Sequence, residues 1–493
     1  MADVKISELT ALTSPDGAEE LVVNDGGTTK KITITNATSA SLARAGGTMT
    51  GVIAGFESTG IDDNATSTVI QIEDDGDVLL KSGANYAWIR AWEATTGNMI
   101  IGADTSSTGS GGSALILKTR GAERVLIDST GIDVTGSVND SSGNVRAGRK
   151  NLIINGSMQV AQRGTSVTGV GNGDNGFHTC DRWQYVESGD TGSVFTLTQS
   201  TDAPSGFGNS MKFDCTTAES TLAANEQLRL RYKFEGQDLQ QLKKGTSEAE
   251  SFTLSFWVKS HTTGAAAVCF YAANRQISAL YTINSSATWE KKTITFSGDS
   301  SSTIPNDAND GFQLWFQLFA GSQYTSGTLP TSWATYNENN NAVGQVLNIA
   351  SSTDNYFQVT GVQLELGSGT DFEHRSYGEE LQLCQRYYQV YGGTSYATIA
   401  SGFQPNRTNA KFHLSYMQEM RAVPSIGTAN SAELIVTDRT GFDQPLAGFG
   451  GHVAGKTSAY ISVTMSAVGT QYAGILLAVK NGTTTTVNLD AEL

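Results

Sequence analysis

The sequence predicts an all-β protein assembled from several modules. Glycine is abundant, with 54 residues against 7 prolines, and charged residues make up only 16% of the chain. A surface built largely from Gly, Ser, Thr and Asn favours strands and tight turns, because these residues are poor in helix interiors. Apolar and polar residues also alternate over long stretches, as in residues 252–259 and 312–319, which is the period of a strand with one buried face.

The charge of the chain excludes two classes of partner. The formal net charge is −16, with a pI of about 4.8 and no basic tract. Phosphate backbones and anionic lipid headgroups repel such a chain, so we expect no nucleic-acid partner and no membrane insertion. The start of the chain lacks a signal peptide, which predicts synthesis in a cytoplasm. The charge is uneven, at −7 over residues 1–150, −10 over 151–380 and +1 over 381–493.

The first two modules carry too few apolar residues for cores of their own. Residues 1–45 hold two short strand patterns around a turn at residues 24–27, and residues 46–148 hold short apolar strands cut by Gly, Asp and Ser. We expect residues 1–45 to dock on another protein, and residues 46–148 to form a shaft of several identical chains. Three chains would satisfy this need, although the strand pattern does not set the number.

Residues 149–380 carry the strongest strand signal and are predicted to form a jelly-roll β-sandwich. Gly361, between two strand patterns, predicts a bulge. Short helices are expected at residues 238–244 and 379–388, the second because its charges match the helix dipole. Residues 381–493 then comprise this short helix followed by a separate β-sandwich.

Several segments resemble bacteriophage tail-fibre proteins. The sequence AGGTMTG at residues 45–51 is similar to a linker of such fibres, and the start KISELTAL…LVVNDGGTTKKIT resembles their attachment segment. MRAVPS at residues 420–425 and the final AEL are similar to fibre tip domains. The segments between them resemble, in order, a carbohydrate-binding-module-like jelly roll of tail fibres: NLIINGSMQVAQRGTS, DRW, EGQDLQQLKKGT, FTLSFWVKS, VQLELG and EELQLCQRYYQ.

This resemblance implies an elongated, homotrimeric, receptor-binding fibre of the virion. Residues 1–45 would attach to a tail, baseplate or adaptor protein, and residues 46–148 would form a trimeric β shaft. Residues 149–380 would form the jelly roll, and residues 381–493 would carry the short helix and a distal receptor-binding β-sandwich tip. The implied receptor is a host surface glycan of the lipopolysaccharide or capsule kind, bound without catalysis.

Two tryptophans of the jelly roll are candidate sugar contacts. Trp257 and Trp315 occupy the strand phase opposite the core residues, so they would form a platform for sugar rings if both strands lay in the concave sheet. Gln313, Gln317 and Lys259 would then supply hydrogen bonds. The alternative is that a loop or a neighbouring chain covers the indoles, because large aromatic side chains are usually buried.

A Gly-rich stretch in the last module is the second candidate site. Bacterial surfaces are generally anionic, and residues 381–493 lack the repulsive charge of the rest of the chain. We therefore expect the primary receptor contact on a loop at residues 441–455, with Phe442, Phe449 and His452. The alternative is that this loop only connects strands.

The sequence predicts no catalytic or metal-ligating set and no cofactor. The acidic run at residues 73–77 misses the spacing of a calcium loop and is interpreted as a solvated turn, so a structural calcium stays unassigned. Residues 298–300 and 371–374 match an esterase class only superficially, because that class needs an α/β sheet. Two rival functions are a polysaccharide-degrading tailspike and a purely structural tail component.

We expect four free, buried thiols at Cys180, Cys215, Cys269 and Cys384.

Overall fold

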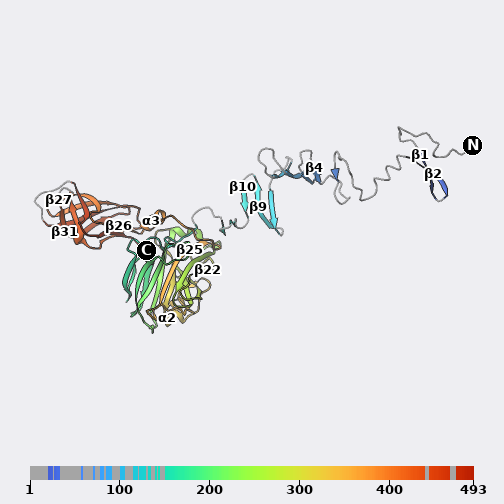
Figure 1. Ribbon diagram of the computed structural model, residues 1–493. Helices are drawn as coiled ribbons and strands as arrows, with labels where there is room; N and C mark the ends of the chain where they lie inside the picture. The colour runs from blue at the N-terminus through green and yellow to red at the C-terminus, as the bar shows by residue number, and fades with distance from the viewer. Residues whose placement is uncertain are drawn as a thin grey trace, which may run out of the picture. The chain divides into compact units, whose positions relative to one another are not determined.

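The computed structural model describes residues 150–493 apart from residue 172, residues 439–442 and residues 467–473. Before residue 150 it describes short strands and the turn between the first two. The chain divides into two compact units, Met1–Gly136 and Ser137–Leu493 (Figure 1). No helix among these described residues is long and apolar enough to span a membrane.

The first unit is built from short antiparallel strands. The expected hairpin is present, with β1 (Glu20–Asp25) paired to β2 (Thr28–Thr33). The next five strands form one sheet and the last three another. A trimeric shaft stays a prediction, and the acidic run at residues 73–77 lies outside the described residues. The strands are β3 (Glu57–Ser58), β4 (Ile70–Ile72), β5 (Val78–Ser82), β6 (Asn85–Arg90), β7 (Ile100–Thr105), β8 (Leu115–Thr119), β9 (Ala122–Asp128) and β10 (Gly131–Val134).

Two antiparallel sheets form the predicted sandwich in the second unit, drawn from green to yellow in Figure 1. One sheet has six strands, in the order β13 (Ser166–Gly171), β16 (Val194–Ser200), β17 (Ser210–Thr217), β25 (Tyr356–Leu366), β19 (Phe252–Ser260) and β22 (Glu290–Phe296). The other has seven, in the order β14 (Asn175–Phe177), β15 (Gln184–Ser188), β18 (Gln227–Glu235), β23 (Asp310–Ala320), β20 (Gly264–Ala272), β21 (Arg275–Ile283) and β24 (Ala334–Thr335). A two-residue hairpin, β11 (Asn139–Asp140) and β12 (Gly143–Asn144), precedes them.

The core between the two sheets is rich in aromatic rings. Phe256 of β19 packs edge-on against Phe316 of β23, with ring centroids 4.9 Å apart, and against Tyr281 at 5.0 Å. The alternation of apolar residues therefore identifies the core face of both strands correctly. Gly361 has φ +60° and lies at a register shift between β19 and β25, which confirms the predicted bulge.

Short helices occur close to where the sequence predicts them. η2 (Gly236–Leu242) is a 3-10 helix, and α3 (Tyr377–Gln385) is capped by Ser376, whose Oγ accepts a hydrogen bond from the Glu379 amide. The other short helices are α2 (Ser322–Thr325), η3 (Glu338–Asn340) and η4 (Ser431–Glu433). All four cysteines are buried and free, as predicted.

The C-terminal strands close into a six-stranded barrel, whereas we expected a sandwich. Register shifts bend β27 and β31, and at Gly402 an added Cβ would collide with the carbonyl of Lys411. Bulges and glycines of this kind let strands curve enough to close a barrel. The barrel order is β27 (Thr398–Asn406), β28 (Asn409–Ser415), β32 (Ser458–Met465), β31 (Asp443–Ala454), β30 (Leu434–Thr437) and β33 (Ile475–Val479), and beside it lie β26 (Tyr388–Gly392), β34 (Thr486–Asp490) and β29 (Ser425–Thr428).

Arg182 joins the sandwich to the C-terminal strands. Its side chain is 1% exposed and forms an ion pair with Glu492. Its Nη2 also donates a hydrogen bond to the carbonyl of Lys233 at 2.6 Å, and the guanidinium lies 3.4 Å from the ring centroid of Tyr387. A buried charge is tolerated when it is paired and hydrogen-bonded in this way. We call this region the junction.

Further ion pairs surround Arg182 at the junction. Arg163 reaches Asp490 at 3.2 Å and Glu492 at 3.4 Å. Arg386, just after α3, makes two hydrogen bonds of 2.7 Å to the buried carboxylate of Glu235. Five of the segments that resemble tail fibres thus supply contacts here, because DRW, AQRG, EGQ, QRYY and AEL each contribute at least one partner.

We expect Arg182→Ala to lower the free energy of unfolding of the second unit by about 3–5 kcal/mol, because it removes the closer of the two cations paired with buried Glu492 and leaves only Arg163 at 3.4 Å. Trp183, next to Arg182, provides a fluorescence signal for denaturant unfolding of the full chain. The double variant with Glu492→Ala should cost less than the sum of the two single changes. Additive costs would show that the two side chains are not coupled.

Asp181 predicts a pH dependence of stability. Burial raises the pKa of Asp181 to about 6, although the charge of Arg163 and the hydrogen bonds from Gln162 act to lower this pKa. A carboxyl whose pKa is higher in the folded state binds its proton more tightly there, so its stabilisation is complete below about pH 4 and is lost as pH rises through about 6. Relative to Asp181→Asn, the wild-type chain should lose about 3 kcal/mol of unfolding free energy over that range. Parallel pH profiles for the two proteins would contradict this expectation.

Candidate functional site

The predicted tryptophan platform is wrong, because its residues lie on different sheets. Trp257 and Lys259 belong to β19 of the six-stranded sheet, whereas Gln313, Trp315 and Gln317 belong to β23 of the seven-stranded sheet. Both strands face the common core with their phenylalanines, so their opposite faces point away from each other. The two indoles therefore cannot contact one sugar chain on one surface.

The outer face of the seven-stranded sheet gathers aromatic and polar side chains. Arg231 of β18 lies opposite Trp315, and Trp315 lies opposite Cys269 of β20. In the neighbouring row, Gln313 lies between Lys233 and Tyr271. Opposed residues on one face have Cβ atoms close enough to interact, so these rows form one continuous surface, which we call the basic–aromatic face.

Three rings form the aromatic part of this face. Tyr271 and Trp315 are stacked, with ring centroids 5.4 Å apart and planes inclined by 12°. Tyr336 meets both edge-on, at 5.1 Å from Tyr271 and 6.2 Å from Trp315. The Trp315 indole N–H donates a hydrogen bond to Oε1 of Gln313 at 2.8 Å. The rings are thereby held in fixed orientations.

The segment that carries Tyr336 covers one end of the face. Gln317 is fully buried and donates through Nε2 to the carbonyl of Asn341 at 3.5 Å. Trp315 is 4% exposed, so the alternative reading, in which a loop covers the indole, holds for this residue. Tyr271 and Tyr336 are half-buried and keep part of their rings at the surface.

Three cations line the other end of the face. Arg229, Arg231 and Lys233 alternate along β18 and are each half-buried. The guanidinium carbon of Arg229 lies 4.5 Å from the ring centroid of Trp315, a cation–π contact. Burial lowers the pKa of Arg229, and burial together with Arg229 lowers the pKa of Arg231 to about 10.

Few acceptors balance these cations. Lys233 Nζ lies 3.6 Å from Asp310 and donates a hydrogen bond of 2.9 Å to an oxygen of Leu493, whereas among the described residues no carboxylate pairs with Arg229 or Arg231. Arg231 donates to Oε1 of Gln184 at 3.0 Å. Within the described part of the chain, Nε of Arg229 is buried without a hydrogen-bond acceptor. This face therefore carries unmatched positive charge, in a segment whose net charge is −10.

Trp257 belongs to a separate aromatic cluster on the six-stranded sheet. A Cβ at Gly361 would lie 2.7 Å from Phe207 and 3.0 Å from Trp257, so the bulge brings these rings together. Phe207 also packs on Phe372 and His374, at 5.0 and 5.2 Å. These rings come from two segments that fold over the sheet, and they act as a small satellite core.

Lys259, the remaining predicted contact, is engaged within the chain. Its Nζ lies 2.8 Å from the carboxylate of Asp202, which also accepts a hydrogen bond from the indole of Trp289 at 3.1 Å. The ammonium group is thereby neutralised. Lys259 therefore offers no free donor comparable with those of the basic–aromatic face.

The second candidate site is a strand over most of its length, and not the predicted loop. Residues 443–454 form β31 of the barrel, because this Gly-rich segment pairs with both β30 and β32. Phe449 packs partly against the barrel core, while His452 is exposed. Phe442 lies outside the described residues.

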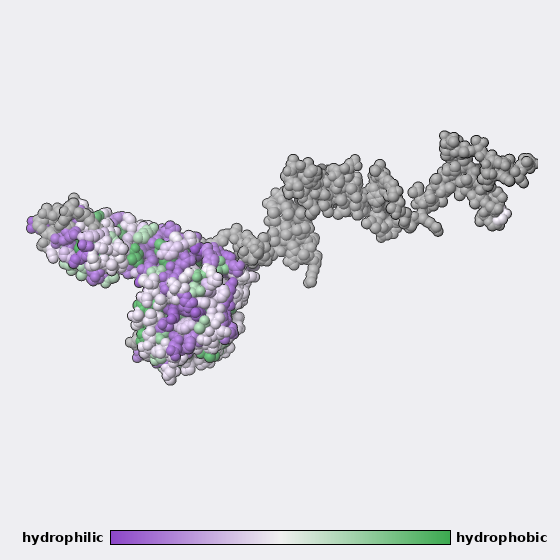
Figure 2. Space-filling model, viewed as in Figure 1, coloured by the Kyte–Doolittle hydropathy of each residue, from purple (hydrophilic) through white to green (hydrophobic). Residues whose placement is uncertain are grey.

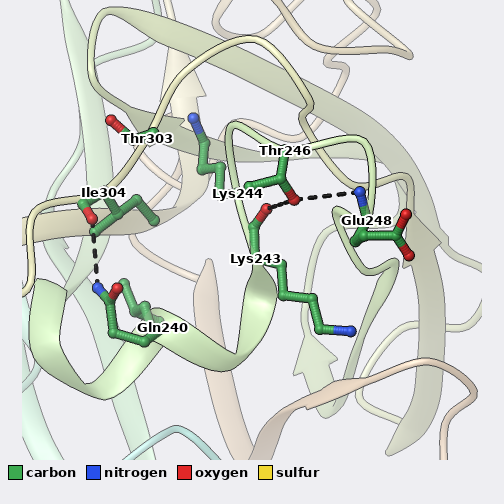
Figure 3. A pocket seen from close by; sticks show the side chains of 8 residues that line it. Gln240, Lys243, Lys244, Thr246, Glu248, Thr303 and Ile304 are labelled. Atoms are coloured by element: carbon green, nitrogen blue, oxygen red, sulfur yellow. Dashed lines mark hydrogen bonds between the residues drawn. The ribbon is translucent and has the colours of Figure 1, made fainter.

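A pocket of about 470 Å³ lies at the end of η2, lined by Leu239, Ile304 and nearby polar residues; Figure 3 shows its side chains. Of its two lysines, Lys244 is paired with the buried carboxylate of Asp299 at 2.8 Å. Arg275 also reaches Asp299 at 2.8 Å, so the esterase-like block at residues 298–300 holds a structural ion pair.

Among the described residues no group of three His, Cys, Asp or Glu side chains could hold a metal ion.

Comparisons with known proteins give similarity to sugar-binding modules at low scores. No protein-family model matches the chain, and no curated protein does. A CBM4 structure is 12% identical, covering 43% of this chain and 98% of that chain, with a TM-score of 0.20. A family 11 carbohydrate-binding module from Clostridium thermocellum is 14% identical, with coverages of 41% and 95% and a TM-score of 0.21.

A tandem CBM22 structure from Paenibacillus barcinonensis Xyn10C is 9% identical and covers 71% of this chain and all of that one, with a TM-score of 0.20. At TM-scores this low, no inference about the ligand of this chain is drawn from these structures. The chemistry of the basic–aromatic face follows from the side chains of this chain alone.

Sequence reasoning identified Gln313, Trp315 and Gln317 but missed their neighbours. Tyr271, Tyr336 and the three cations of β18 were not singled out. The signal for the cations was present, because QLRLRYKF alternates apolar and basic residues with the period of a strand. No local pattern identifies Tyr336, which reaches the face from a distant loop.

Trp315→Ala should lower the free energy of unfolding by about 3–5 kcal/mol, because the indole is buried among Tyr271, Tyr336 and Arg229. Trp257→Ala should cost about 1–2 kcal/mol, because that ring is only half-buried. Denaturant unfolding of both variants measures the difference. Equal costs would contradict the burial assigned to these two indoles.

Proposed function

We propose that this protein is the receptor-binding fibre of a bacteriophage tail and that its sandwich binds a host surface glycan without catalysis. The observation that carries the proposal is the basic–aromatic face. Aromatic ring faces suit the apolar side of a sugar ring, and amide and guanidinium groups suit its hydroxyls. Tyr271, Tyr336, Gln184 and Arg231 combine these groups at a partly exposed surface.

The role in a virion is supported by the tail-fibre-like motifs along the chain. In this proposal residues 1–45 dock on a tail or baseplate protein, and the chain assembles as a homotrimer. A face that binds glycans on the host cell gives such a fibre its attachment function. The lipopolysaccharide or capsule of a bacterium would present glycans of this kind.

Tyr271→Ala should weaken binding of the labelled protein to susceptible bacteria by about 1–3 kcal/mol, by analogy with aromatic stacking of other planar ligands. Tyr377→Ala is the matched control, because Tyr377 is 57% exposed on α3, outside this face. Enzymatic removal of the surface glycan should abolish binding of the wild-type protein. Undiminished binding to stripped cells would refute the proposal, and release of reducing ends would favour the tailspike instead.

The barrel is a second candidate for receptor contact. It is favoured by the net charge of +1 over residues 381–493 and by its exposed side chains. His452 and Val453 are both exposed on β31, Val453 at 74%. Truncation before the barrel is a poor test, because it also removes Glu492 from the junction. The double variant His452→Ser with Val453→Asp leaves the junction intact, and it should reduce phage adsorption several-fold if the barrel contacts the receptor. Unchanged adsorption assigns the contact to the sandwich alone.

A further inference from the structure

The cations of the basic–aromatic face indicate the class of glycan that it binds. Arg229, Arg231 and Lys233 project from alternate positions of β18, so their charged groups lie along one line of the outer face. Each is half-buried, which weakens hydration of its charge without removing it from contact with a ligand. Cations in such places are usually paired with carboxylates.

Among the described residues, Arg229 and Arg231 have no carboxylate partner, whereas Lys233 has both Asp310 and an oxygen of Leu493. Asp310 serves Lys233 at 3.6 Å and also accepts a hydrogen bond from Gln313 at 2.5 Å. Arg231 has a neutral partner, the side-chain oxygen of Gln184. Arg229 rests on the Trp315 ring, and in the described residues its buried Nε has no acceptor.

Other cations of the same sandwich show the contrast. Lys244 and Lys259 each pair with a carboxylate at 2.8 Å. Acidic residues outnumber basic ones in this segment, which has a net charge of −10. Arg229 and Arg231 therefore differ from these cations in having no carboxylate partner among the described residues.

We infer that the basic–aromatic face binds an acidic glycan, whose carboxylate or phosphate groups lie against Arg229 and Arg231 while its sugar rings contact Tyr271 and Tyr336. This inference rests on the proposed glycan-binding function and narrows its ligand. An anionic group on the ligand supplies the carboxylate or phosphate partner that Arg229 and Arg231 do not have among the described residues. The guanidinium fork of Arg231 suits planar two-point contact with a carboxylate or a phosphate.

The experiment compares three soluble probes with the full-length protein by calorimetry. Polygalacturonate oligomers carry carboxylates, glycerol-phosphate oligomers carry phosphates, and dextran oligomers of similar length are neutral. We expect at least tenfold tighter binding of one anionic probe than of dextran, with an affinity that falls as salt rises from 50 to 500 mM. The better of the two anionic probes identifies which group the face prefers.

Two variants test the assignment to β18. Arg231→Gln keeps a polar side chain, and Arg229→Met keeps the apolar contact with Trp315 while removing the charge. Each should weaken binding of the anionic probe about tenfold or more and flatten its salt dependence, while binding of neutral dextran falls by a clearly smaller factor. Lys291→Gln is the matched control, because it removes one exposed cation from β22 of the opposite sheet.

The outcomes separate this inference from the proposed function. Equal binding of dextran and the anionic probes, without salt dependence, overturns the acidic-glycan inference and leaves glycan binding intact. Loss of all three probes together in Arg231→Gln, with an unchanged thermal transition, also overturns it. If no glycan binds to the wild-type protein, both proposals fail. A change of native mass in the variants would assign the cations to a subunit interface instead.

Discussion

The guanidinium of Arg182 is enclosed by groups from distant parts of the chain, and the arrangement of the second unit depends on this contact. Glu492 supplies the charge, the carbonyl of Lys233 an acceptor and Tyr387 a ring face. Removing any of these from a buried cation costs more than the contact contributes, because the charge is then left without compensation. Lys233 lies in β18, Tyr387 follows α3 and Glu492 follows β34, so this contact ties the three segments together. The C-terminal strands thereby become part of the framework that holds the sandwich.

The sequence pattern was sufficient for the fold class, because strand periodicity reports local burial. It identified the core residues of β19 and β23, the bulge at Gly361 and both helices, to within a few residues. It could not show which sheet each strand joins, because either sheet gives the same alternation. Closure of the barrel also depends on register shifts between strands that are far apart in the sequence. The motifs of the junction were recognised by resemblance, but the buried pairs that they form became visible only in three dimensions.

At the candidate site, too, the sequence predicted the local strand pattern but not the long-range packing. Trp315 and Gln317 were correctly placed on the face opposite the core, and the structure then covers them with a distant loop. Whether such a face is open depends on long-range packing, which a single strand does not encode. Figure 2 shows that the visible surface of the sandwich is mostly hydrophilic, with only scattered hydrophobic residues. The distinction of the basic–aromatic face lies in the unmatched charge of β18.

The junction also affects how the chain matures. Arg182 and Glu492 are separated by 310 residues, so a ribosome needs roughly 15–60 s to deliver the second partner after the first. During that interval the guanidinium of Arg182 has no Glu492 to pair with, and hydration by water is its remaining compensation. The buried pair can form only after the last strand of the second unit has been made. Closure of this contact is therefore a late event in the synthesis of the chain.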